Sequence, residues 1–166
     1  MGNRSTIRMA SLILIGLSIF ATLGQSQIEE NRTSVNNLTQ SELNYLNLSN
    51  TAWNMYNEDL VYASQILDEF VKKNISSRNA MMATTSAYVL DSITASNVAK
   101  TNPPEKFILL HRDTTQAFNY LQSYMWNLAK YYETGEGKYA TVARNSFNSS
   151  IQFKEKADEK LTEFAK

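Results

Sequence analysis

Residues 107–131 carry a repeat that strongly limits what this chain can fold into. Apolar or small side chains recur there at alternating intervals of three and four residues, over more than three heptads. This spacing places the side chains on one face of an α-helix that packs against other helices. The stripe consists of Phe107, Leu110, Thr114, Ala117, Leu121, Tyr124, Leu128 and Tyr131, widened by His111, Phe118, Met125 and Tyr132.

Three other segments show helical spacing and predict three more helices. The first has its apolar stripe at Leu46, Trp53, Tyr56, Leu60, Ala63, Leu67 and Phe70. The second, rich in Ala, Ser and Thr, has Met82, Ser86, Val89, Ile93 and Ser96. The last is looser, with Ala143, Phe147, Ser150, Ala157, Leu161 and Phe164.

Short turn signals separate the four segments. Serines follow Asn74, Pro103 and Pro104 stand where a helix can begin, and TGEG at residues 134–137 is typical of a helix end. The predicted helices are 42–73, 77–99, 103–133 and 138–164. Short connections between helices of this length predict an all-α fold, an antiparallel up-down-up-down four-helix bundle over residues 42–166.

The N-terminal segment has the features of an export signal. Arg4 and Arg8 precede an uncharged apolar run, residues 9–23, and small residues follow at Gly24 and Ser26. This order predicts a signal peptide over residues 1–26. Its apolar run is shorter than the roughly 20 residues of a spanning helix, although a retained signal would act as an N-terminal membrane anchor. Residues 27–41 are polar and predict a flexible spacer.

The composition excludes several classes of function. The chain has no cysteine, which rules out thiolate metal sites, iron–sulfur clusters and a cysteine nucleophile. Without residues 1–26, acidic residues outnumber basic ones by only two. That balance does not indicate a nucleic acid or an anionic membrane surface as a partner. We expect an extracytoplasmic protein, secreted or associated with the cell surface.

No catalytic, cofactor or metal site can be assembled from the motifs. His111-Arg112-Asp113 resembles the kinase HRD only by chance, because the other kinase motifs are missing. His111 is the single histidine, so it has no partner histidine for a metal, although it could sense pH. A carboxylate-only metal site stays open as an alternative, with Asp91 as the acidic residue that could turn inward. We therefore expect no enzyme activity.

The aromatic residues allow a second hypothesis. Tyrosine hydroxyls and the indole N–H need polar partners when they are buried, and a small ligand could supply them. A pocket in the core would be lined by Trp53, Tyr56, Tyr88, His111 and Tyr124. Ordinary core packing explains the same residues. The favoured function is contact with another protein or a cell-envelope component; the alternative is a small-molecule-binding or sensor bundle.

Sequons provide the most specific motif in the exported part. The pattern N-x-S/T occurs at Asn31, Asn37, Asn47, Asn74 and Asn148. These asparagines are candidate N-glycosylation sites if the protein is exported through a glycosylating pathway.

Overall fold

Helix α3, Gln40–Val71, begins with a reciprocal cap. The Thr39 hydroxyl accepts the backbone N–H of Glu42 at 3.3 Å, and the Glu42 carboxylate accepts the N–H of Thr39 at 2.7 Å. This capping box satisfies two backbone donors that a helix start leaves free. The computed structural model describes residues 38–164. The predicted signal peptide and residues 27–37 of the predicted spacer lie outside the described residues, and Gln40 and Ser41, assigned to the spacer, are helical.

Helix α4, Ser77–Lys100, follows a short turn. The turn contains Lys73 with a positive φ of 61°, a conformation that ends a helix. Ser76 then caps α4 by accepting the backbone N–H of Asn79 at 3.2 Å. The serine cap expected from the sequence is therefore present.

The sequence predicted that Pro103 and Pro104 open the third helix, and this prediction is wrong. Residues 101–104 are not helical, a single 3-10 turn spans Glu105–Phe107, and helix α5 covers Ile108–Thr134. A residue that precedes proline is disfavoured in the helical region, which accounts for Pro103 staying outside the helix. Pro104 itself has an extended ψ of 149°. Its carbonyl accepts the N–H of Phe107 at 2.8 Å.

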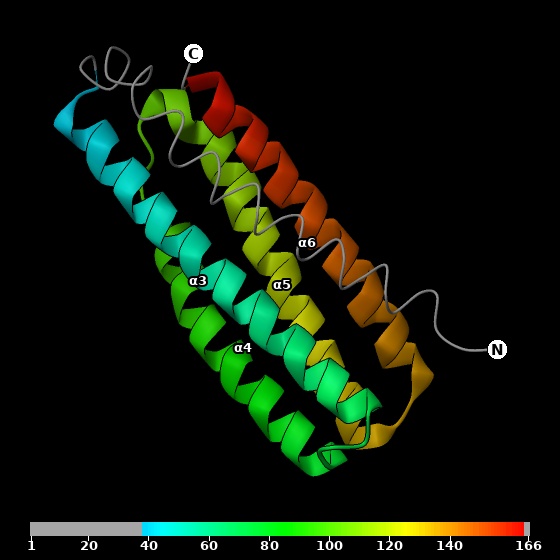
Figure 1. Ribbon diagram of the computed structural model, residues 1–166. Helices are drawn as coiled ribbons and strands as arrows, with labels where there is room; N and C mark the ends of the chain where they lie inside the picture. The colour runs from blue at the N-terminus through cyan, green and yellow to red at the C-terminus, as the bar shows by residue number, and fades with distance from the viewer. Residues whose placement is uncertain (1–37, 165–166) are drawn as a thin grey trace. The chain divides into compact units, whose positions relative to one another are not determined.

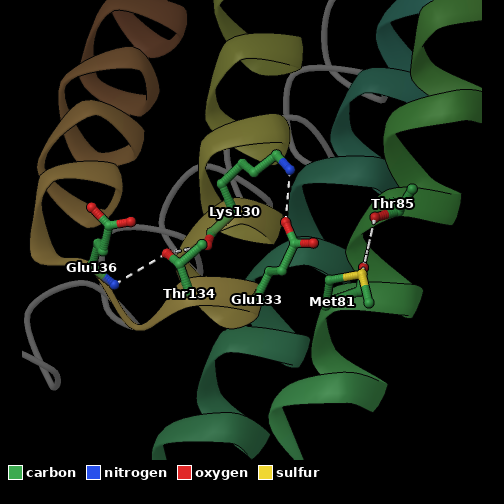
Figure 2. A network of polar contacts seen from close by, with 6 residues as sticks. All are labelled: Met81, Thr85, Lys130, Glu133, Thr134 and Glu136. Carbon is green, nitrogen blue, oxygen red and sulfur yellow. Dashed lines mark hydrogen bonds and ion pairs between the residues drawn. The ribbon is translucent and has the colours of Figure 1, made fainter.

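Local hydrogen bonds cap the C-terminal end of α5. Gly135 has a left-handed φ of 71°, and its N–H bonds to the carbonyl of Tyr131 at 2.8 Å. Figure 2 shows the neighbouring contacts: the Thr134 hydroxyl accepts the N–H of Glu136 at 3.2 Å, and Lys130 pairs with Glu133 at 2.7 Å. Helix α6, Gly137–Phe164, follows directly.

The four helices pack against one another, and consecutive helices run in opposite directions (Figure 1). The predictions of an all-helical chain and of four packed helices are confirmed. Helix α5 packs against both α4 and α6, and α3 packs mainly against α4. The Cα atoms of α3 and α6 stay more than 8 Å apart. The large side chains of Trp53, Tyr56 and Phe118 meet in ring contacts in the interior.

Helix α5 buries the face that its repeat predicted. Seven of the eight stripe residues are buried, and Tyr131 packs against the core at its edge. Phe118, Met125 and Tyr132, which widen the stripe, are buried as well.

Helix α4 is turned differently from the prediction. The predicted core residues Met82, Val89 and Ile93 are exposed. The buried face consists instead of small and polar side chains, namely Ala80, Ala87, Ala95, Val98, Thr84, Asp91 and Thr94. Small side chains let neighbouring helix backbones approach closely, and they recur at the same helical spacing as the larger residues. The sequence pattern therefore contained two stripes, and we predicted the wrong one.

Candidate functional site

The five residues predicted to line a pocket lie in four separate places. Trp53 and Tyr56 pack edge to face at a ring distance of 5.1 Å, and both are buried. Tyr124 packs against Phe147. Tyr88 lies 5.6 Å from Trp126, and His111 lies 6.0 Å from Tyr45, measured between ring centroids. The structure does not bring the five together.

His111 borders a small cavity. The cavity has a volume of about 10 Å³, and its lining includes Tyr45, Ser49 and Thr114. That is room for about one water molecule, far below the size of a ligand pocket. Burial lowers the pKa of His111, which favours the neutral imidazole at neutral pH.

Asp113 of the HRD sequence is held in an ion-paired environment. Its carboxylate is fully buried and lies 2.7 Å from the Lys160 ammonium and 2.9 Å from the Arg112 guanidinium. Burial raises the pKa of Asp113, but the hydrogen bonds and charges of Lys160 and Arg112 outweigh it, so that the pKa lies below its ordinary value. The HRD sequence thus forms an ion pair between α5 and α6.

Asp91 is the second fully buried carboxyl group, and it differs sharply from Asp113. It lies on the inner face of α4, as the sequence had allowed, and neither of its oxygens accepts a hydrogen bond from another residue. Burial, with a smaller contribution from the negative charge of Asp59, raises the pKa of Asp91 to about 8. The carboxyl group is therefore mostly protonated at neutral pH.

Asp91 and Asp59 do not form a metal centre by the usual criteria. Within residues 38–164, no group of three or more His, Cys, Asp or Glu side chains is arranged to hold a metal ion. Burial first, and then the charge of Glu58, raises the pKa of Asp59 to about 6. The negative charge of the half-buried Asp59 thus adds to the effect of burial in keeping Asp91 protonated.

The outer side of α4 is rich in exposed apolar side chains and poor in charge. Between Arg78 and Lys100 the only charged residue is Asp91, which is buried. Large apolar side chains face outward there, with exposed fractions of 54% at Met82, 51% at Val89, 59% at Leu90 and 57% at Ile93. An open hollow of about 560 Å³ runs along this side, lined by Tyr88, Val89, Ser92, Ile93, Ser96, Asn97 and Lys100.

Neighbouring helices extend this apolar surface on both sides. The Thr94 hydroxyl lies 3.5 Å from the Met55 sulfur, so that Met55 on α3 borders α4. Tyr62 lies two turns further along the same side of α3 and is also exposed. On the other side, Tyr88 contacts the exposed ring of Trp126 on α5. We call this region the α4 outer surface: Met55, Tyr62, Met82, Val89, Leu90, Ile93 and Trp126.

The sequence analysis missed this surface because it assigned the larger apolar residues of α4 to the core. One signal was available: Ala80, Ala87 and Ala95 recur at close to heptad spacing, which is typical of a close helix contact.

The chain was compared with protein-family models, with curated proteins and with solved structures, and none of the three comparisons finds a match. The α4 outer surface is therefore interpreted from its own residues.

Two further results concern the membrane and the sequons. No helix within residues 38–164 is long and apolar enough to cross a membrane. Asn47, Asn74 and Asn148 are exposed, whereas Asn31 and Asn37 lie outside the described residues. The Asn74 side chain donates a hydrogen bond to Glu69 at 2.9 Å, so a glycan attached there would leave a single N–H for that contact.

Proposed function

We propose that this protein is exported and acts without catalysis, through contact with another protein or a cell-envelope component. In this proposal it is an antiparallel up-down-up-down bundle that follows a signal peptide and a polar spacer. The α4 outer surface is the contact surface. The signal-like order of residues 1–26 supports export, and mass spectrometry of the mature chain, with cleavage near Gly24 or Ser26, tests it.

The observation that carries the contact function is the distribution of side chains on α4. Burying Met82, Val89 and Ile93 would contribute to stability, yet the helix buries Ala, Thr and Asp. Contiguous exposed apolar surface on a soluble domain marks an interaction site. The geometry favours this function over a ligand pocket, since the five aromatic and histidine candidates lie apart.

Photo-crosslinking in cells that produce the protein tests the contact surface. A photoreactive phenylalanine replaces Ile93 on α4 or, as the control, Val142 on α6; both residues are exposed. A discrete adduct from position 93 and none from position 142 is the expected result. Equal labelling at both positions, or no adduct at position 93, would contradict the proposed contact surface.

A further inference from the structure

We infer that a second copy of this chain occupies the α4 outer surface, with the two α4 helices packed antiparallel about a two-fold axis near Val89. This inference rests on the proposed contact function and names the partner. It draws on the order of large and small residues along α4 and on the area that is exposed, and the distribution of charge supplies a test.

The α4 stripe is self-complementary when it is reversed. Val89 lies midway between Met82 and Ser96, so an antiparallel copy centred on Val89 places each Met82 beside Ser96 of the other copy. Ser86 and Ile93 lie three and four positions from Val89 on opposite sides, which brings those two residues together as well. Met82 and Ile93 thus each face a serine, while Val89 meets Val89 of the other copy at the axis, and large-against-small packing of this kind lets two helices approach closely.

A parallel arrangement lacks this complementarity. It would place Met82 beside Met82 and Ser86 beside Ser86, which alternates crowded layers with empty ones. Closed two-fold dimers are the commonest oligomers, and both arrangements satisfy that symmetry, so the pairing of large with small residues decides between them.

The exposed area is sufficient for a small interface. Seven large side chains form the α4 outer surface, and each is about half exposed. At roughly 150–250 Å² for an aromatic side chain and less for an aliphatic one, they offer at most on the order of 700 Å² per chain when all seven lie in the contact. Stable interfaces begin at about 600 Å² per partner, so the dimer would be of modest strength.

The charged residues at the two ends of α4 predict how dimerisation depends on the salt concentration. Arg78 and Lys100 lie eleven positions on either side of Val89, so the antiparallel arrangement brings Arg78 of each copy near Lys100 of the other. These like charges repel across the rim of the contact, and salt screens that repulsion. Dimerisation should therefore strengthen as the salt concentration rises. A partner whose acidic residues contact Arg78 and Lys100 would instead bind less tightly as the salt concentration rises.

Disulfide trapping tests the arrangement, because the chain has no cysteine of its own. Three single variants of the full chain are made: Val89→Cys, Met82→Cys and Ser96→Cys. Val89→Cys should cross-link with itself, and the Met82→Cys and Ser96→Cys variants should cross-link with each other in a mixture but weakly alone. Strong self-cross-linking of Met82→Cys would overturn the antiparallel arrangement.

Sedimentation of the full chain provides the second measurement. Ile93→Glu should convert the dimer to monomer, and Val142→Glu, the control on α6, should leave it unchanged. If sedimentation gives a monomer at up to about 100 µM and no cysteine variant cross-links, the second copy is excluded. A photo-adduct at position 93 with a different protein or a lipid would also overturn this inference while supporting the proposed contact function.

Discussion

The Tyr56 hydroxyl and the Ser150 hydroxyl lie 2.7 Å apart in the interior and join α3 to α6. Ser150 donates its proton to the Ala117 carbonyl at 2.7 Å, so Tyr56 donates to Ser150. Because the backbones of α3 and α6 stay apart, this chain of hydrogen bonds ties together three helices, α3, α5 and α6.

The first prediction concerns this hydrogen-bonded chain. Tyr56→Phe removes one donor and should lower the free energy of unfolding by about 0.5–1.5 kcal/mol. Ser150→Ala should cost more, about 1–3 kcal/mol, because the buried Tyr56 hydroxyl then has no partner. Urea unfolding of both single variants and of the double variant measures the coupling. Strictly additive losses would show that the two hydroxyls do not interact.

The second prediction concerns the pH dependence of stability through Asp91. The pKa of Asp91 is raised to about 8 in the folded state, above the ordinary value of an unfolded aspartate. The folded state therefore binds more protons between these two values, and stability falls as the pH rises from about 4 to about 8. Asp91→Asn should reduce this fall and exceed the parent chain at pH 9 by about 2 kcal/mol or more.

Asp113→Asn is the matched control for Asp91. The folded-state pKa of Asp113 is lowered, so its contribution is present above the unfolded value and is lost as the pH falls through the folded value. Asp113→Asn should destabilise the protein at pH 7 by about 1–3 kcal/mol, since Lys160 and Arg112 lose their partner and both are partly exposed. Urea unfolding at pH 4.5, 7 and 9 compares the variants. Parallel pH profiles for the parent chain and Asp91→Asn would refute the role of Asp91.

The third prediction concerns the turn between α5 and α6. Gly135 has a positive φ of 71°, and nothing lies within 4 Å of an added Cβ atom. Gly135→Ala should therefore cost about 1–2 kcal/mol through backbone strain alone. Gly137, which has no positive φ and equally open surroundings, is the control. Gly137→Ala should be neutral or slightly stabilising in thermal unfolding, and equal losses at both positions would contradict this explanation.

The helices were predictable wherever large apolar residues formed a single stripe. In α5 the stripe from Phe107 to Tyr131 has no competing face, so spacing alone identified its core. The start of α5 was less predictable. Proline is compatible with a first helical turn; Pro104 disfavours a helical Pro103, but the extended ψ of Pro104 itself does not follow from that rule.

In α4 the sequence contained two faces of equal period. Size favoured Met82 and Ile93, while close packing favoured Ala87 and its neighbours; only the tertiary structure decides between them. The candidate site was likewise only partly predictable. Asp91 was predicted to be able to turn inward, but its lack of a protein partner depends on side chains from other helices. The α4 outer surface could not be predicted once its own residues, among them Met82 and Ile93, had been assigned to the core.

The orientation of α4 is tested most directly by the thiol-labelling rates of Ile93→Cys and Ala87→Cys. The protein is labelled at nanomolar concentration, where a dimer of modest strength is dissociated. Position 93 should react nearly as fast as in the unfolded chain, because it is exposed, and position 87 should react at least about 100-fold more slowly, because its labelling requires local unfolding. Rapid labelling at position 87 with protection at position 93 would contradict the orientation of α4 and, with it, the proposed contact surface.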